Sequence, residues 1–326
     1  MYKQMSIIVL LVFLSVGVFG DPPPSQAYLR DLYIESPYDV WMLFMENPDS
    51  ETGAGALIVM GNLGKGNQYI TDNINNYLAQ VNYLFRSGKT VNYSTVSACI
   101  AAITELGSIS SYPVLFDLLC AGYPEVIVSE AYGALDLING NLYRFLSGII
   151  EENPPEEKFA ALKAGINSQR LSVSERGQLA ESALDLSIAA GGENADLNAM
   201  RYASITTLSS LGWTRANMLA IRHYYRVQAD YTRGIAPKYR LIEAITCLGA
   251  VGNSDAALAL GLQLGLINAR TVNTGAFDAD ITLAIVQALG HIGYNAAFDH
   301  LLYASNLSYG ENITSAAREA INRLKW

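Results

Sequence analysis

The sequence has 326 residues, of which 51% are hydrophobic and 16% are charged, and its formal net charge is −9. This composition excludes an intrinsically disordered chain and is sufficient for a large buried core. The charge is uneven, because residues 21–152 carry 5 Lys and Arg against 15 Asp and Glu, whereas residues 153–326 carry 15 of each. An acidic first half repels nucleic acid, so we expect no nucleic-acid partner.

Residues 1–20 predict a secretory signal peptide. An apolar run extends from Met5 to Val18 after a basic start, and Val18 and Gly20 are small enough for the positions before a cleavage site. An uncleaved anchor is the alternative, but the run is shorter than the ~18 residues that span a bilayer. We therefore expect a mature chain 21–326 with no transmembrane segment, located in the periplasm or outside the cell.

Five segments along the mature chain share a short pattern. In each, an apolar helical stretch ends in Leu or Met, and Gly or Ser, any residue, an aliphatic residue and a small residue follow. We expect the first small residue to let two helices approach closely, and a second Gly to adopt the left-handed conformation that ends a helix. The segments are Leu57–Gly64, Ile103–Ser110, Ile205–Gly212, Ile245–Gly252 and Val286–Gly293.

The spacing of these segments indicates a repeat of helix pairs. Ser209 and Gly249 are 40 residues apart, Gly249 and Gly290 are 41 apart, and Gly61 and Gly107 are 46 apart. All three offsets fit the ~40–47 residue period of HEAT and armadillo units.

The segments Leu248–Asp255 and Leu289–Asn295 resemble the HEAT-like repeats of bacterial scaffold proteins and bilin-lyase relatives. In those units Ala-Leu-Gly-x-Ile-Gly precedes an Asp-rich turn and a second helix. The match is weaker at 97–119, where a Tyr-Pro step replaces the acidic turn, and at 203–212, where Ser209 replaces the Gly. The resemblance implies an all-α fold, a HEAT-like α-solenoid of stacked antiparallel helix pairs, in an exported bacterial member of the family.

The middle of the chain has helical patterning without a clear repeat segment, so the repeat register between 120 and 200 is undefined. Pro154 and Pro155 end one helix and begin another, since Pro and the flanking acids suit a first turn. They coincide with the charge boundary and are either a hinge or an ordinary loop. The predicted parts of a single α-solenoid over 21–326 are an acidic N-terminal half at 21–152, a candidate hinge at 153–157 and a C-terminal half at 158–326.

No motif in the sequence supports catalysis or metal binding. The three His residues lack zinc-site spacing, no Gly-x-Ser-x-Gly occurs, and Asp278-Ala-Asp280 is better explained by helix capping than by a calcium loop. We interpret Cys99, Cys120 and Cys247 as small core residues, with a Cys99–Cys120 disulfide as the alternative. We therefore predict no enzyme, no catalytic residues, no metal and no cofactor.

The most distinctive local feature is a helix predicted from about Trp213 to Tyr231. Four Arg residues fall near one line on it at 100° per residue, while Tyr224 and other large residues lie opposite. This arginine stripe is either a solvated face paired with neighbouring acids or a face that binds an anion or a partner, because Arg suits carboxylate and phosphate. With two cations from the next helix, the candidate partner-binding residues are Arg215, Arg222, Arg226, Arg233, Lys238 and Arg240.

These observations predict an exported, non-enzymatic binding or scaffold protein that presents a helical-repeat surface to a protein or peptide. The partner is anionic if the arginine stripe binds it. Two alternatives stay open: an enzyme with a lyase-like or hydrolytic site on the concave face, and a structural envelope component that associates with itself.

Overall fold

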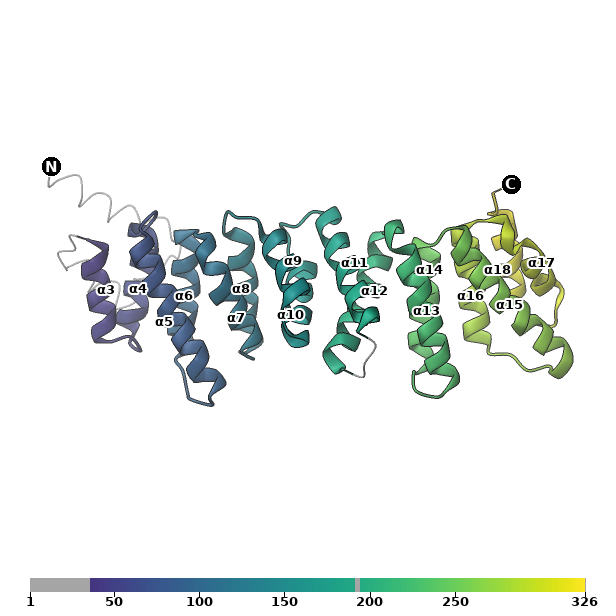
Figure 1. Ribbon diagram of the computed structural model, residues 1–326, viewed down its shortest axis with the longest axis horizontal. Coiled ribbons are helices and arrows are strands. Elements are labelled where there is room, and N and C mark those ends of the chain that lie inside the picture. The colour runs from purple at the N-terminus through teal and green to yellow at the C-terminus, as the bar shows by residue number, and fades with distance from the viewer. Residues whose placement is uncertain (1–35, 191–193, 326) are drawn as a thin grey trace. The chain divides into compact units, whose positions relative to one another are not determined.

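A computed structural model describes residues 36–190 and 194–325, and the predicted signal peptide at 1–20 lies outside the described residues (Figure 1). Within these ranges the protein has sixteen α-helices and three short 3₁₀ helices. It has no strand there, and an isolated bridge joins Tyr294 to Lys325. The predicted all-α class is confirmed.

The chain forms two compact units. Unit 1 comprises the residues up to Phe145 together with Asn167–Arg170, and unit 2 comprises Leu146–Ile166 and the residues from Leu171 onward. The helices of unit 1 are α3 (Pro37–Glu46), α4 (Glu51–Leu63), α5 (Gln68–Arg86), α6 (Tyr93–Leu106), η1 (Ile109–Ser111), α7 (Tyr112–Cys120), α8 (Glu125–Leu137) and the start of α9 (Leu142–Glu152). The helices of unit 2 are the rest of α9, α10 (Pro155–Asn167), α11 (Val173–Ala189), α12 (Ala195–Leu211), η2 (Thr214–Ala216), α13 (Asn217–Thr232), α14 (Lys238–Val251), α15 (Ser254–Thr274), α16 (Ala279–Ile292), η3 (Asn295–Ala297), α17 (Phe298–Asn306) and α18 (Glu311–Asn322).

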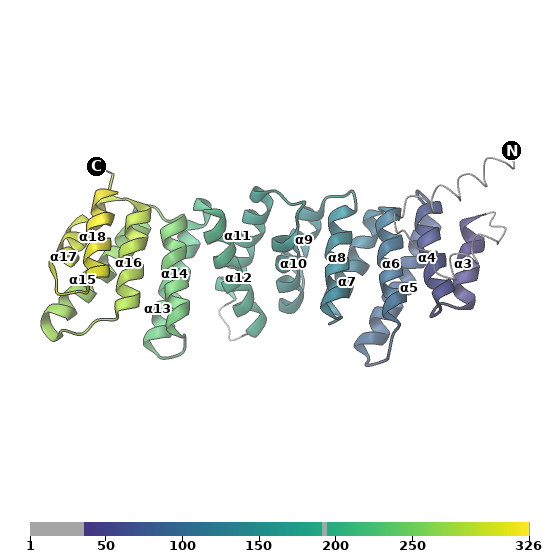
Figure 2. The ribbon, with the colours of Figure 1, turned by 180° about the vertical axis from the view of Figure 1, so that it is seen from behind.

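In unit 1 each helix from α3 to α6 packs side by side with the α-helix two positions further along the chain, and helices related in this way form a row. Helices α4, α6 and α8 lie side by side in that order, and α5 packs on both α6 and α7 (Figure 2). Leu57 of α4, Ile103 of α6 and Leu115 of α7 are fully buried between these helices. The apolar stripe of each helix is thus removed from water by its neighbours, which is the main source of its stability.

Unit 2 repeats this arrangement with α12, α14, α16 and α18 as neighbours in one row. Helices α13, α15 and α17 pack on α14, α16 and α18 respectively. Leu248, Leu260 and Leu289 are fully buried in this core.

Local sequence signals set several helix ends. Pro155 begins α10, as the sequence predicts, because Pro needs no hydrogen-bond acceptor in a first turn. Asp278 caps α16, since its Oδ1 accepts hydrogen bonds from the backbone N–H groups of Asp280 at 3.1 Å and Ile281 at 3.2 Å. The capping interpretation of Asp278-Ala-Asp280 is therefore confirmed.

All five repeat segments end helices, namely α4, α6, α12, α14 and α16. A Cβ atom at Gly249 would lie 3.0 Å from the Cα atom of Ala288, and one at Gly290 would lie 2.9 Å from the Cβ atom of Ala320. Both distances are below normal van der Waals contact, so the predicted close approach of helices at Gly249 and Gly290 is confirmed.

The predicted left-handed ending holds at only some segments. Gly293 has φ 71° and ends α16 as expected, whereas Gly252 has φ −74° and leaves α14 in an extended conformation. Position 252 favours Gly because it has no room for a side chain, since a Cβ atom there would lie 2.7 Å from the Cβ atom of Ala256. The prediction is therefore wrong at Gly252, and it is also wrong at Gly64, whose φ is −88°.

The three cysteines all lie in the described ranges, and none forms a disulfide. Cys99 and Cys247 are buried, and burial raises the pKa of Cys247 to about 12. Cys99 and Cys247 fill core positions as expected, whereas Cys120 is only partly buried, and the alternative Cys99–Cys120 bridge does not form. Among the described helices, none has the length and hydrophobicity of a membrane span.

Candidate functional site

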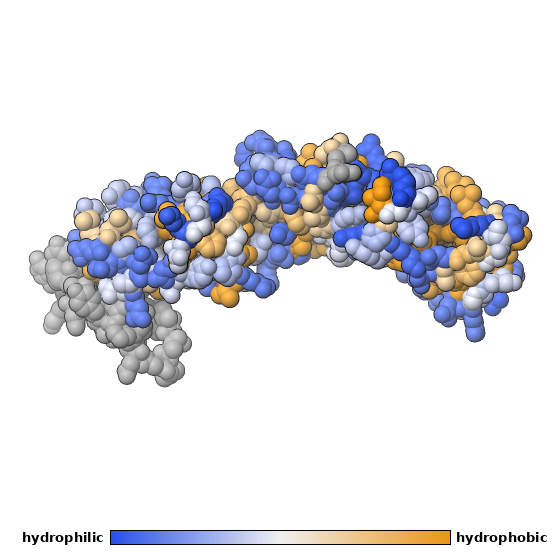
Figure 3. Space-filling model, turned by 90° about the horizontal axis from the view of Figure 1, so that it is seen from below, coloured by the Kyte–Doolittle hydropathy of each residue, from blue (hydrophilic) through white to orange (hydrophobic). Residues whose placement is uncertain are grey.

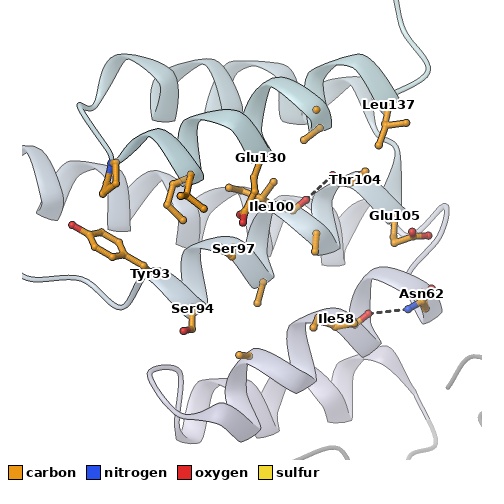
Figure 4. A pocket seen from close by; sticks show the side chains of 18 residues that line it. Ile58, Asn62, Tyr93, Ser94, Ser97, Ile100, Thr104, Glu105, Glu130 and Leu137 are labelled. Atoms are coloured by element: carbon orange, nitrogen blue, oxygen red, sulfur yellow. Dashed lines mark hydrogen bonds between the residues drawn. The ribbon is translucent and has the colours of Figure 1, made fainter. Parts of the chain in front are cut away.

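Unit 1 contains a groove of about 1200 Å³ that crosses α4, α6 and α8 (Figure 4). Helical periodicity explains its lining, because residues three or four apart share a face. We refer to it as the α4/α6/α8 groove. Its lining residues include Ala54, Ile58 and Asn62 of α4, Tyr93, Ser94, Ser97, Ala98, Ile100, Ala101, Thr104 and Glu105 of α6, and Val126, Ile127, Glu130, Gly133, Ala134 and Leu137 of α8.

Several of the residues that line the groove are small. Ala54, Ala98, Ala101 and Ala134 lie where larger side chains would fill the space, and a Cβ atom at Gly133 would have no heavy atom within 4 Å. The three packed helix faces therefore leave a hollow rather than a flat surface.

Exposed hydrophobic side chains mark the edges of the groove. Figure 4 shows Tyr93 and Leu137 at opposite ends, with Glu130 between them. Val126 is 69% exposed and Leu137 is 70% exposed, although both are large apolar residues. A rim of this kind around a hollow is typical of a binding surface.

An aromatic cluster holds Tyr93 in place. The rings of Phe85 and Tyr123 stack with centroids 4.0 Å apart, and Tyr93 presents an edge-on contact to both at 6.2 Å. Burial raises the pKa of Tyr123 to about 12. Because such aromatic contacts restrict ring rotation, the Tyr93 side chain is preorganised at its end of the groove.

Of the described residues, seven polar ones line the groove, and the two that carry a charge, Glu105 and Glu130, are both acidic. The Asn62 amide donates a hydrogen bond to Ile58 O at 3.1 Å, and the Thr104 hydroxyl donates one to Ile100 O at 2.8 Å, so both serve their own helix. Lys65 Nζ lies 3.4 Å from Glu105 Oε2, while Glu130 has no ion pair within the described residues. The groove therefore carries an uncompensated negative charge at Glu130.

The groove residues do not form recognisable catalytic machinery. No His, Cys, Lys or Arg is among the described residues that line it, so its Ser residues have no His or Lys base in the groove. No group of three or more His, Cys, Asp or Glu residues that could hold a metal ion occurs in 36–190 or 194–325. The arrangement suits noncovalent binding of an apolar surface.

The arginine stripe lies in unit 2, but not on one continuous helix. The predicted helix from Trp213 is interrupted, because η2 precedes α13 and α13 begins only at Asn217. Arg215 lies in η2 and Arg233 caps the C-terminus of α13. A 3₁₀ turn advances about 120° per residue, so Arg215 does not follow the α-helical line. The predicted start at Trp213 is therefore wrong, whereas Tyr224 is buried as expected.

Most of the six candidate cations contact acidic residues. Arg226 of α13 has no ion pair within the described residues, and both Arg226 and Arg240 are partly buried. Binding by the stripe stays a prediction. The ion pairs are Arg215 with Glu181 at 3.0 Å, Arg222 with Asp185 at 3.8 Å, Arg233 with Asp230 at 2.5 Å, Lys238 with Asp278 at 3.3 Å and Asp280 at 2.6 Å, and Arg240 with Glu243 at 2.8 Å.

No motif in the sequence predicted the α4/α6/α8 groove. The available signal was the presence of large apolar residues at both ends of α8, at Val126 and Leu137, where polar residues are more usual. A comparison of the sequence with models of known protein families found no match, and a comparison with curated proteins found none either.

Proposed function

We propose that the chain is an exported, non-enzymatic binding protein whose α4/α6/α8 groove binds an amphipathic helix of a partner protein. The partner helix has an apolar face flanked by Lys or Arg. The observation that carries this proposal is the groove itself, a hollow with exposed apolar edges and an unpaired carboxylate at Glu130.

The repeat pattern supports an α-solenoid as the framework of this surface. Recurring segments with close-contact glycines at Gly61, Gly249 and Gly290 bring successive helices of a row together. A HEAT-like solenoid of antiparallel helix pairs presents such rows as an extended surface. On the face shown in Figure 3 hydrophilic residues predominate and hydrophobic residues gather in separate patches, which fits a protein that binds through limited apolar surfaces.

A helical partner is favoured because the groove offers almost no partners for an exposed peptide backbone. The main-chain groups of α4, α6 and α8 bond within their own helices, and Asn62 and Thr104 already donate to backbone oxygens. An extended peptide would find few protein donors and acceptors here for its own N–H and C=O groups. A helix satisfies these groups internally and presents only side chains.

A basic flank on the partner follows from charge. Residues 36–145 carry 4 Lys and Arg against 10 Asp and Glu, and Glu130 lies in the groove without a cation. Complementary charge accelerates association and sets the orientation of a bound helix.

The experiment is a selection of ~20-residue helix-forming peptides from a displayed library against the purified chain. Enriched peptides should have apolar residues at i, i+3 or i+4, and i+7, with Lys or Arg beside them. Their affinity should fall as salt is raised, because Glu130 contributes electrostatically.

A matched pair of variants locates the binding surface. Leu137→Glu places a charge at the end of the groove, whereas Leu266→Glu makes the same change at a Leu of α15 that is 67% exposed. Only Leu137→Glu should reduce peptide binding. Enrichment of acidic peptides, or equal binding by the two variants, contradicts the proposal, and concentration-dependent association of the chain that Leu137→Glu abolishes would show a second copy in the groove instead.

A further inference from the structure

Unit 2 buries two basic side chains that have unsatisfied hydrogen-bonding groups. Arg201 of α12 is 3% exposed and His223 of α13 is 0% exposed. Arg201 Nε and Nη1 and His223 Nδ1 and Nε2 are buried and have no hydrogen-bond partner. Leaving such groups unpaired is energetically costly, and more so for a charged group. Native proteins rarely keep several of them together, so these atoms are suited to hold a ligand.

The ring of Tyr202 lies beside Arg201 and His223, and Arg240 contacts the same ring. The Arg240 guanidinium lies 3.9 Å from the centroid of the Tyr202 ring, and the Arg201 guanidinium lies 5.1 Å from it. The His223 ring meets Tyr202 edge-on with centroids 5.6 Å apart. Three basic side chains from α12, α13 and α14 therefore surround Tyr202.

The positive charge of this cluster is not balanced by protein acids. Arg240 is paired with Glu243 at 2.8 Å, and Asp230 is paired with Arg233 at 2.5 Å. Arg201 and Arg226 have no ion pair within the described residues. Two formal positive charges are thus left over, one of them buried.

We propose that Arg201, His223 and Arg226 form a binding site for a free inorganic dianion, sulfate or phosphate, with Arg240 and Tyr202 at its edge. A dianion neutralises the two unpaired guanidinium groups and accepts hydrogen bonds from Arg201 and His223. Guanidinium groups are the preferred protein ligands of such tetrahedral oxyanions.

The surroundings of His223 suit this ligand rather than a cation or a water molecule. Burial and the charges of Arg201, Arg226 and Arg240 lower the pKa of His223 to about 3, so its ring is neutral and donates one N–H. The same arginines repel a metal ion. Water could accept hydrogen bonds here, but it would not neutralise the two charges.

Burial also limits the size of the ligand. Arg201 and His223 are almost completely enclosed, while Arg226 and Arg240 are partly exposed. The solvent-accessible side of the site is therefore the one formed by these two side chains. A small free anion suits this site better than a phosphate group attached to a larger molecule, because Arg201 and His223 leave little accessible surface for further contacts.

The test is calorimetric titration of the purified chain with sodium sulfate and sodium phosphate at constant ionic strength in a chloride background. Saturable binding with one site per chain is expected for both anions, and acetate and phosphoserine should not bind. Arg226→Gln should weaken sulfate binding at least ~10-fold, because a charge-assisted contact is lost. Arg201→Met should abolish the binding, and the melting temperature of this variant without sulfate should equal or exceed that of the parent, because a buried unpaired charge is removed.

Arg222→Gln is the matched control, because Arg222 lies on the same helix as Arg226 but pairs with Asp185. It should bind sulfate like the parent. Parental binding by both Arg226→Gln and Arg201→Met overturns the site, as does a chain that takes up no sulfate. Equal binding of phosphoserine overturns the assignment to a free inorganic anion. Should Arg201→Met not fold, Arg226→Gln alone decides, since its partly exposed side chain is not required for the core. This site is independent of the α4/α6/α8 groove.

Discussion

Units 1 and 2 use the same helix packing for different surfaces. In unit 1 the row α4, α6 and α8 carries small residues with Glu130, and the result is an open hollow with apolar edges. In unit 2 the helices α12, α13 and α14 carry Arg201, His223 and Arg240, and the result is a largely buried, positively charged cluster. The same packing of helices can therefore carry different surface chemistry, because a few residues on each helix face determine whether a groove or a buried charge results.

The largest expected effect is on the pH dependence of stability, through His223. Its pKa of about 3 in the folded chain lies below the ordinary value of 6.5, so the unfolded chain binds a proton that the folded chain does not. Stability from this group is therefore present above pH ~6.5 and is lost as the pH falls towards ~3, by an amount on the order of a few kcal/mol. His223→Gln should flatten the dependence of the melting temperature between pH 7 and 4, in chloride buffers without sulfate or phosphate.

The charged and titratable groups named around His223 are Arg201 and Tyr202 of α12, Arg226 of α13 and Arg240 of α14. None of the three arginines changes its charge in this pH range, so the difference between parent and variant reports His223. His291→Gln is the control, because His291 is exposed on α16 and its replacement should keep the parental slope. Equal slopes for parent and His223→Gln would mean that His223 is not buried in a cationic environment.

Glycine substitutions sharpen the contrast between tight and open packing. Gly249→Leu in unit 2 should lower the free energy of unfolding by ~1–3 kcal/mol, because its Cβ position already lies 3.0 Å from Ala288. Gly133→Ala in unit 1 should raise it by ~0.5–1 kcal/mol, because Ala favours the helix and the space is open. Urea unfolding of the two variants measures both effects. A neutral Gly249→Leu contradicts the close approach of α14 and α16.

The smallest expected effect separates two arginines of the stripe. Arg222→Ala removes an exposed contact of 3.8 Å with Asp185 and should change stability by less than ~0.5 kcal/mol. Arg226→Ala should stabilise slightly in the absence of sulfate, because Arg226 repels Arg201. Thermal melts at low salt distinguish the two. Destabilisation by Arg226→Ala would mean that this side chain has a counterion which the ion-pair geometry does not show.

The sequence predicted the parts of the fold that depend on local patterns. Helix ends at Pro155 and Asp278 follow from capping chemistry, and the close contacts of Gly249 and Gly290 follow from their repeat spacing. The 3₁₀ turn before α13 was missed, because a wheel of 100° per residue assumes an unbroken helix.

Both candidate sites were missed because each combines residues from three helices. Arg201 and His223 are 22 positions apart, and only packing shows that both are buried. One signal for a buried His223 was present in the sequence. His223 directly precedes Tyr224, which was predicted to lie on the core side of the helix. The groove depends on small residues of α4, α6 and α8, and small residues in a helix do not reveal whether a neighbour fills the space above them.

Two valine variants test whether the α4/α6/α8 groove binds a partner helix. Val126 and Val173 both lie in the first turn of a helix and are 69% and 53% exposed, but only Val126 lines the groove. Asp is tolerated at both positions, since an acid suits a helix N-terminus. Binding of a selected amphipathic peptide can be measured by fluorescence anisotropy. The Kd should be at least ~10-fold weaker for Val126→Asp and within ~2-fold of the parent for Val173→Asp. The reason is that only Val126→Asp places a new charge where the bound peptide removes it from water. Equal Kd values for the two variants would contradict the account.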